Sequence, residues 1–371
     1  MAEGSGRDDR HAADPVPMPP SDIPSFPVAL LALAETPGIG HQSLSRLVDL
    51  CGDRLGRLLA CPPEEAAARL AELKAPSRLT GPLAGADPRM LDKARAQMDE
   101  LASRNIHVLG PERLPRRLTR LPDPDRPRWL FLQGDPEALN GTHVAVVGTR
   151  EPSASGADAA RAAVQTMAAY PLALVSGLAN GIDAAAHDRA LECGLRNVAF
   201  LGHGLDLVFP AETGSLRGRI IEQGGAVATE YPPGRRYRRE QFVQRNRLQA
   251  GLAQAVVVAE GRVSGGTAHT VGFAQRYRTP VIGLRGAGIS DELNRLISSL
   301  PQGRVIDVST APGLRALDRF LRNLAEADGH PTHALSRVER HLLQECERRE
   351  LRPDDLLRLR NLLHRLLDGK P

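Results

Sequence analysis

Residue types that bind phosphate stand at the end of an apolar run in the middle of this chain. The run reads HVAVVGTR, from His143 to Arg150, and it ends in Gly148-Thr149-Arg150 with Ser153 shortly after. A glycine after a buried strand lets the backbone approach a ligand, and free amides together with a guanidinium can hold an anion. The segment therefore indicates a phosphate site, although a lone Gly-Thr-Arg is common and weak by itself.

A second segment of the same kind follows the next apolar run. It reads SGLANGID, from Ser176 to Asp183. Its glycines, Gly177 and Gly181, permit a positive φ, and Asn180 lies between them. Asp183 suits a cap on the helix expected next, and capping alone and a role at the site both remain open.

Two further glycine-rich segments follow later apolar runs. One is GHGLD, whose His203 could be a general base, but no serine or cysteine nucleophile is paired with it by spacing, so a solvated loop histidine is favoured. The other is GRVSGGT, whose successive amides would form a second anion nest where a helix begins. Its candidate binding residues are Arg262, Ser264, Gly265, Gly266 and Thr267.

An arginine-rich run lies between these segments. It reads RRYRREQFVQRNR, from Arg235 to Arg247, and holds six arginines and one acidic residue. Such a run is often only a solvated face, but Tyr237 and Phe242 lie within it, which favours binding of a phosphate backbone. Arg245, Asn246 and Arg247 are its candidate binding residues.

No cofactor or metal is expected from these segments. The chain has no G-x-x-x-x-G-K-S/T pattern and no strand-linked G-x-G-x-x-G followed by a ribose-binding acid, which argues against an ATPase and a standard dehydrogenase. Its four cysteines are scattered without a C-x-x-C pair, so neither a zinc site nor a disulfide framework is indicated. We expect a sheet that binds phosphate without a catalytic residue set.

Composition adds limits rather than an assignment. The 371 residues carry a formal charge of +4, which is only mildly basic and is weak support for a polyanionic partner. Aromatic residues make up 3% of the chain, which disfavours a stacking platform for single strands unless a few rings are placed deliberately. Arginines would then carry most of the binding.

Strand and helix patterns alternate in the second half of the chain. The strands and helices that they predict must position the glycine-rich and arginine-rich segments. This alternation predicts an α/β fold, a mostly parallel sheet with helices on both faces. The carboxyl ends of parallel strands share one edge, so the glycine segments should meet there. The expected strands are 106–108, 144–147, 172–175, 198–201, 226–229, 255–259, 281–284 and 305–308.

Four regions are expected along the chain. Residues 1–26 read as a disordered leader without the apolar core of a signal peptide, and no stretch has the roughly 18 apolar residues that span a membrane, which predicts a cytoplasmic protein. Residues 27–110 should form a small helical domain, of helix-hairpin-helix or SAM-like type, in which the loop 36–40 between two amphipathic helices could meet a phosphate or serve only as a turn. A proline-studded connector, 111–128, opens the domain of the sheet, which should span 111–325 and bind phosphate, and 326–371 should be a short helical extension with helices near 335–349 and 353–367.

Six segments in order carry a family resemblance. They are VAVVGTREPSASG, SGLANGIDAAAH, FLGHGLDLVFPAE, TEYPPG, QRNRLQAGL and ELNRLI, and they resemble the signature segments of the DprA/Smf DNA-processing family. The preceding LLALAETPGIG resembles the helical domain of that family, so the likeness covers about residues 28 to 300.

The resemblance implies a function. It implies a Rossmann-like domain that binds single-stranded DNA, helps to load the RecA recombinase during natural transformation, works as a homodimer and has no known catalysis. By the family pattern, Arg150 is the strand-binding arginine. The residues that would line the same basic pocket are Ser176, Gly177, Arg245, Asn246 and Arg247.

The chain departs from the family pattern at several positions. Asn180 and His203 replace residues common in the family, Thr213 stands where an asparagine is usual, and Val263 stands where a lysine is frequent. The tail is too short, and too poor in strand patterns, for the winged helix of many relatives. These departures put a lysine contact with phosphate and binding of duplex DNA through a winged helix in doubt.

Two other classes of function stay open. One is a nucleotide-binding phosphoribohydrolase of a related Rossmann-like superfamily, for which Glu230 and Glu260 could supply the acidic pair, although capping or solvation would also explain them. The other is a sensor in which the sheet binds a free nucleotide.

Overall fold

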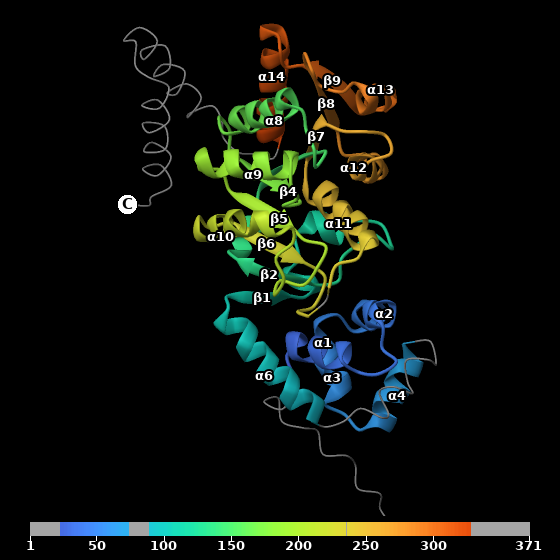
Figure 1. Cartoon of the computed structure of the whole chain (residues 1–371). Coiled ribbons are helices and arrows are strands. Elements are labelled where there is room, and N and C mark those ends of the chain that lie inside the picture. The colour runs from blue at the N-terminus through green and yellow to red at the C-terminus, as the bar shows by residue number, and fades with distance from the viewer. Residues whose placement is uncertain (1–22, 74–88, 235, 328–371) are drawn as a thin grey trace, which may run out of the picture. The chain divides into compact units, whose positions relative to one another are not determined.

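The computed structural model describes residues 23–73, 89–234 and 236–327 (Figure 1). Most of the expected leader and nearly all of the expected tail, with its two helices, lie outside these residues. The chain divides into two compact units between Asp99 and Glu100. Within the described ranges, no helix combines the length and apolar character needed to cross a bilayer.

The first unit is helical. Its helices are α1 (Phe26–Ala34), α2 (His41–Cys51), α3 (Gly56–Leu59), α4 (Pro63–Glu72) and the start of α6 (Arg89–Ser103), with a 3-10 turn over Gly52–Leu55. The loop expected at 36–40 does separate α1 from α2, and the Thr36 hydroxyl donates to the Ala32 carbonyl at 3.0 Å. The expectation that α1 is amphipathic was wrong, because none of its residues is exposed. A DNA contact by this loop stays a prediction.

The second unit is built on one nine-stranded sheet, in the order β1-β2-β6-β5-β4-β3-β7-β8-β9. The strands from β3 to β9 pair in parallel, whereas β1 and β2 pair antiparallel, which confirms the predicted α/β class. The strands are β1 (Ile106–Leu109), β2 (Leu130–Gly134), β3 (Thr142–Gly148), β4 (Leu172–Ser176), β5 (Asn197–Phe200), β6 (Ala226–Thr229), β7 (Ala255–Glu260), β8 (Val281–Arg285) and β9 (Gly303–Asp307).

The region around the proline-studded connector differs from expectation. The connector contains a short helix, α7 (Arg116–Thr119), and β2, which follows it, was not predicted. Because β1 pairs antiparallel with β2, it belongs to the sheet, and the division between the units falls earlier than the expected boundary after residue 110.

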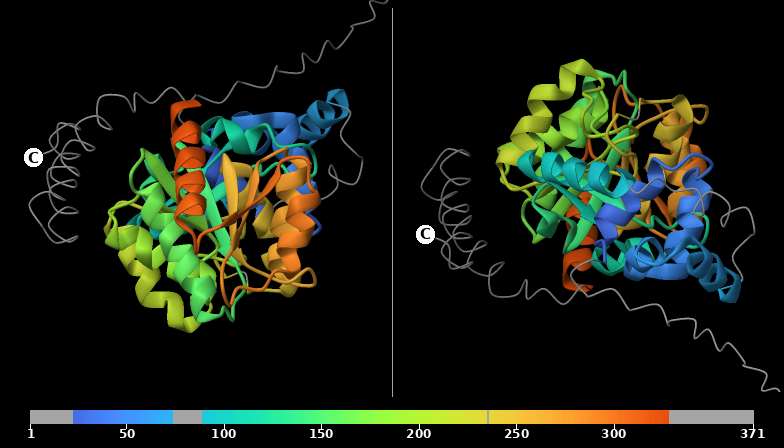
Figure 2. Two further views of the ribbon diagram at one scale, coloured as in Figure 1. Left: turned by 90° about the horizontal axis from the view of Figure 1, so that it is seen from above. Right: turned by 90° about the horizontal axis from the view of Figure 1, so that it is seen from below.

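Helices cover both faces of the sheet (Figure 2). They are α8 (Ala154–Met167), α9 (Ile182–Glu192), α10 (Gly214–Glu222), α11 (Arg239–Leu252), α12 (Gly266–Arg276), α13 (Glu292–Ser299) and α14 (Ala311–Ala327). The alternation of β3 divides the core in two: Val144 and Val146 pack with α8, α9 and α14, and Ala145 and Val147 pack with α11, α12 and α13. Burial on both faces explains why these strands read as continuous apolar runs.

The strand order reverses between β3 and β7. From β3 the chain moves outward through β4, β5 and β6, and it then returns to β7 on the other side of β3. The loops that follow β3 and β7 therefore leave the sheet edge in opposite directions. In open α/β sheets a crevice opens at such a switch point, outside the carboxyl ends of the strands.

Candidate nucleic-acid interface

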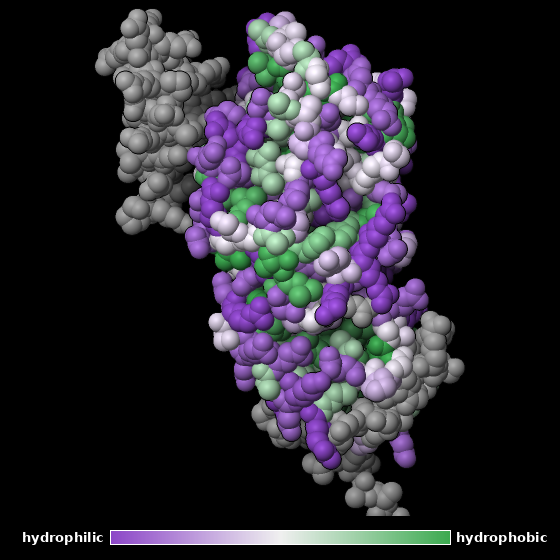
Figure 3. Space-filling view, in the orientation of Figure 1, coloured by the Kyte–Doolittle hydropathy of each residue, from purple (hydrophilic) through white to green (hydrophobic). Residues whose placement is uncertain are grey.

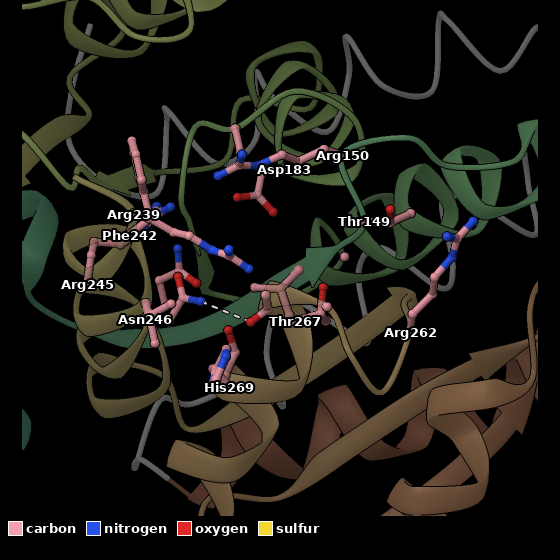
Figure 4. Close-up of a pocket in the computed structure, with 18 of the residues that line it drawn as sticks. Thr149, Arg150, Asp183, Arg239, Phe242, Arg245, Asn246, Arg262, Thr267 and His269 are labelled. Carbon is pink, nitrogen blue, oxygen red and sulfur yellow. Dashed lines mark hydrogen bonds between the residues drawn. The ribbon is translucent and has the colours of Figure 1, made fainter. Parts of the chain in front are cut away.

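A pocket of about 560 Å³ lies at this switch point, lined by the loops after β3 and β7, by Ala179 and Asp183, and by α11 and the start of α12. It brings together ten of the fifteen predicted binding residues. These are Gly148, Thr149, Arg150, Arg245, Asn246, Arg262, Ser264, Gly265, Gly266 and Thr267. In Figure 4, Arg150 and Asp183 approach from one side, and Asn246, Thr267 and His269 lie on the other.

Several lining residues had no predicted role at the pocket. Tyr237 and Phe242 belong to the arginine-rich run, where their rings favour binding of a phosphate backbone, and for Asp183 the sequence leaves capping alone and a role at the site both open. No sequence signal singles out His269, because α12 carries no motif beyond the glycine-rich turn at its start. The additional lining residues include Glu151, Phe209, Tyr237, Arg239, Phe242, Gln249 and His269.

Arg150 lies at the rim of the pocket. Its side chain is exposed, and its guanidinium carbon lies 5.5 Å from the centre of the Phe242 ring. No carboxylate forms an ion pair with Arg150 among the described residues. A guanidinium that rests on an aromatic face and lacks an internal carboxylate partner is available to an anionic ligand.

The opposite wall is the glycine-rich turn that enters α12. Gly265 occupies the N-cap position without a side-chain cap, so the amides of the first turn, at Gly266 and Thr267, have no partner within the helix. The Asn246 amide donates to the Gly266 carbonyl at 3.1 Å and ties this turn to α11 (Figure 4). Arg262 is exposed beside the turn, so amides and a guanidinium are presented together.

Ser153 does not belong to the pocket. Its backbone amide and its hydroxyl both donate to the Glu260 carboxylate, at 2.8 and 2.9 Å, while the hydroxyl accepts from the Gly156 amide and caps α8. The expected anion clamp at this helix start is therefore already filled by a side chain of the protein. Glu260 thus supports the cap of α8, which agrees with the interpretation of Glu260 as a capping residue rather than as part of an acidic pair.

Arg247 does not belong to the pocket either. It is buried and donates two hydrogen bonds to the Glu230 carboxylate, at 2.6 and 2.7 Å. The paired charge raises the pKa of Arg247 against the effect of burial. Neither Arg247 nor Glu230 lines the pocket, and the two charges neutralise each other, so the structure does not place Arg247 in the basic pocket that the resemblance implied for it.

Arg245 lines the pocket but is also a structural residue. Only 4% of it is exposed, and its Nη1 donates to the Phe200 carbonyl at 2.6 Å. When the side-chain amide of Gln249 is oriented with its oxygen toward Arg245, that oxygen accepts from Arg245 Nη1 at 2.8 Å and from the Gly177 amide at 3.0 Å. Burial lowers the pKa of Arg245 to about 10, and the Asp183 carboxylate acts against this shift.

The loop after β4 supports the pocket from behind. Ser176 is fully buried and its hydroxyl donates to the Val146 carbonyl at 2.7 Å, while the Gly177 amide donates to the Asp183 carboxylate at 3.1 Å. A Cβ on Gly177 would lie 1.9 Å from Arg245 Nη1. Ser176 and Gly177 were predicted to line the pocket, but neither does. Gly177 instead positions Asp183 and Arg245, which do line it.

Asp183 holds this loop rather than capping the helix. It lies in the first turn of α9, whose N-cap is Gly181, and it accepts from the Gly177 amide that precedes the helix. Burial raises the pKa of Asp183, and the charge of Arg245 opposes that shift. Asn180 is exposed and does not line the pocket.

A buried histidine completes the support of the loop. His187 accepts the Leu178 amide at Nε2, at 3.3 Å, and its Nδ1 lies 2.6 Å from the Asn197 side-chain oxygen. Both partners suit the neutral ring, in which Nδ1 carries the proton. Burial lowers the pKa of His187 to about 4.

His203, expected as a solvated loop residue, is buried instead. Its Nδ1 lies 2.9 Å from the Gly204 carbonyl oxygen, and its Nε2 lies 3.2 Å from that of Phe209. The ring makes edge contacts with Phe209 and Phe242. These contacts make His203 a support for the aromatic residues of the pocket.

Comparison with known proteins agrees with the fold and the loop motifs. The family described as DNA recombination-mediator protein A matches the chain over residues 105–305. DNA processing protein DprA of Streptococcus pneumoniae is 37% identical over 176 residues, which are 47% of this chain and 62% of that protein. Protein Smf of Escherichia coli is 36% identical over 165 residues, 44% of this chain and 43% of that protein. The chain thus spans about half the length of the curated relatives it matches.

Solved structures show the same fold. The X-ray structure of DprA from Streptococcus pneumoniae has a TM-score of 0.56 and 25% identity, covering 78% of this chain and 96% of that chain. A structure of DNA processing protein A from Helicobacter pylori, described for its single-stranded DNA binding mode, has a TM-score of 0.52 and 24% identity, covering 59% of this chain and 96% of that chain.

The buried pair predicts the effect of changing Arg247. Arg247→Ala should lower the free energy of unfolding by about 3 to 5 kcal/mol, because it leaves the Glu230 charge buried and unpaired. Urea denaturation measures this loss. The double variant Arg247→Met/Glu230→Leu should recover most of it, since no charge is then left alone. A stable Arg247→Ala protein with a reduced salt dependence of DNA binding would contradict this assignment and restore the contact predicted from sequence.

The neutral histidine predicts a dependence on pH. The pKa of His187 is about 4 in the folded chain, below the ordinary histidine value of 6.5 that applies once the chain unfolds. Between these values the unfolded chain binds more protons, so folding stability falls as the pH falls. This group alone should cost about 2 kcal/mol between pH 7 and pH 5.

Urea denaturation at both pH values, compared with His187→Gln, isolates this contribution. Glutamine does not titrate and can still accept from the Leu178 amide, so the variant should lose less stability than the native chain over the same interval. Equal losses in the two proteins would show that His187 is already protonated or accessible.

Proposed function

This chain belongs to the family of DNA recombination-mediator protein A, and from that membership we propose that it binds single-stranded DNA in the pocket between β3 and β7. The observation that carries the proposal is the position of Arg150 over the Phe242 ring at the pocket rim. An arginine and an aromatic face together serve both parts of a nucleotide, since the guanidinium attracts the phosphate and the ring stacks on a base.

The second wall supports the same proposal. The uncapped first turn of α12 and the exposed Arg262 offer amides and a guanidinium to a phosphate, and the exposed Arg239 lies at the start of α11. The face drawn in Figure 3 carries hydrophilic residues in purple with smaller hydrophobic areas in green. The pocket is lined by arginines and by Phe209, Tyr237 and Phe242, so the binding energy would come from charge and from a few placed rings. An unpaired strand suits this arrangement better than a duplex, because its bases are free to stack on protein rings.

A catalytic role is not part of the proposal. Glu230 and Glu260, the acidic pair that a phosphoribohydrolase would need, are held by Arg247 and by Ser153 respectively. Among the described residues, no group of three or more histidine, cysteine, aspartate or glutamate side chains could hold a metal ion. The proposed function is therefore the binding of single-stranded DNA without a chemical reaction.

The wider role rests on the family. We propose that the chain works in the cytoplasm as a homodimer and delivers single-stranded DNA to the RecA recombinase, for which the family description as a recombination mediator is the support. Strand exchange by RecA on DNA covered by a single-strand binding protein tests this role. Light scattering after size-exclusion chromatography tests the dimer.

Binding itself is tested by fluorescence anisotropy of a labelled poly-dT oligonucleotide at two salt concentrations. We expect tight binding that weakens with salt, with a slope of about 0.7 per neutralised phosphate, and poor competition by a duplex. Binding of a mononucleotide alone would overturn the proposal and favour a nucleotide sensor.

The rim position of Arg150 predicts the effect of removing it. Arg150→Ala should weaken oligonucleotide binding by about 1 to 3 kcal/mol, because a charge-assisted contact and the cover of Phe242 are lost. It should also reduce the salt slope by about 0.7, as one phosphate contact disappears. Thermal melting should be unchanged, since the side chain is exposed.

Arg161→Ala is the matched control. Arg161 lies on α8 outside the pocket and pairs at 2.8 Å with the exposed Asp158, so it carries the same charge without access to the ligand. An equal loss of binding in the two variants would mean that net charge, not the pocket, holds the DNA.

A further inference from the structure

Three aromatic residues gather at the pocket of a chain that has few. The chain holds seven phenylalanines, four tyrosines and one tryptophan, and Phe209, Tyr237 and Phe242 all line the pocket. We call these three residues the aromatic shelf. We propose that the outer ring of the shelf, Tyr237, stacks on one unpaired base of the bound strand; this inference rests on the proposed function and names the ligand part that the shelf recognises.

The exposure of Tyr237 carries the inference. Its ring is 47% exposed, whereas Phe209 and Phe242 are half-buried. The Tyr237 and Phe209 rings stack with centroids 3.9 Å apart and planes inclined by 24°. Phe209 therefore covers one face of the Tyr237 ring, and the rest of the residue is open to solvent. An open aromatic face beside a polar pocket suits a flat ligand such as a base.

The shelf has a rigid footing. Phe209 and Phe242 have centroids 5.6 Å apart, and His203 contacts both from below, at 6.5 and 6.4 Å, with its ring nearly perpendicular to Phe209. A Cβ on Gly202 would lie 2.8 Å from the Phe242 ring, so this glycine allows the close approach of Phe242 to the sheet edge. Rings held in this way need little ordering when a ligand arrives, which favours binding.

Arginines flank the aromatic shelf. Arg150 lies over Phe242, and Arg236, Arg238 and Arg239 are exposed on both sides of Tyr237 in the chain. A base on Tyr237 would therefore have cations near its neighbouring phosphates. Every base has an aromatic face, so such a contact should tolerate any sequence, but it requires that the base be unpaired. A duplex keeps its bases stacked on one another and offers no free face.

The test compares three substitutions at one position. Tyr237→Ala and Tyr237→Leu should each weaken poly-dT binding about 5- to 150-fold, the range for loss of one stacked base. Tyr237→Phe should bind like the native chain, because the ring face is kept. Leucine is the matched control for apolar packing, since it covers Phe209 but cannot stack as a ring does. The salt slope should stay unchanged in all three variants, in contrast to Arg150→Ala, because no phosphate contact is removed.

A spectroscopic readout separates stacking from a structural role. An oligo-dT that carries 2-aminopurine at successive positions should lose fluorescence at one position when the native chain or Tyr237→Phe binds, and should keep it with Tyr237→Leu at saturating protein. Tyr237→Leu binding as tightly as the native chain, or no quenching at any position, would overturn the shelf while leaving salt-dependent binding through Arg150 in place. A native chain that binds no single strand at all would overturn the proposed function and the shelf together.

Discussion

Close backbone packing at the carboxyl edge of β3 and β4 is the constraint on which the rest of the site depends. Gly181 has a φ of +81°, and a Cβ there would lie 2.4 Å from the Thr149 carbonyl and 2.6 Å from that of Arg150. Gly177 leaves the space that the Arg245 guanidinium fills. The glycines of this loop thus allow close packing against protein atoms rather than against a ligand, and they bring the loop against Thr149 and Arg150, the two residues that follow β3. Arg150 is placed by that contact.

The buried arginines and the exposed arginines have different roles: the buried ones hold the structure, and the exposed ones are available to a ligand. A buried cation is costly unless carboxylates or carbonyls satisfy it, and both buried arginines of α11 have such partners: Arg245 with the Phe200 carbonyl and the charge of Asp183, and Arg247 with Glu230. Arg150 and Arg262 remain exposed at the edge. The internal pairs fix α11 and the loop after β4, so the exposed cations are held on a rigid frame, and a ligand meets charge that is already in place.

Sequence reasoning predicted the sheet and the loops that meet at its edge, because continuous apolar runs and glycine segments depend on local pattern. It did not predict the direction of side chains. Arg245 and Arg247 stand two apart on a helix and point to different surroundings, which a motif of neighbouring letters cannot distinguish. Ser153 was assigned to a ligand because its partner, Glu260, lies 107 positions away. The scarcity of aromatic residues argued against a stacking platform, yet Phe209, from the loop after β5, meets Tyr237 and Phe242, which lie just before and within α11. β2 was missed because it follows the proline-studded connector directly and lies outside the strand–helix alternation that revealed the later strands.

Two of the helix starts at this edge, those of α8 and α12, differ in their chemistry, and the difference decides where an anion can lie. The start of α8 is closed, because Ser153 caps it and the Glu260 carboxylate accepts from the Ser153 amide; a Cβ on Gly156 would lie only 2.0 Å from that carboxylate. A phosphate there would meet a negative charge. The start of α12 has a glycine cap and no side-chain acceptor, and Asn246 holds its turn from the side. Since a helix start attracts anions and a carboxylate repels them, the same edge directs a phosphate away from α8 and toward α12, on the side of the pocket where Arg262 lies.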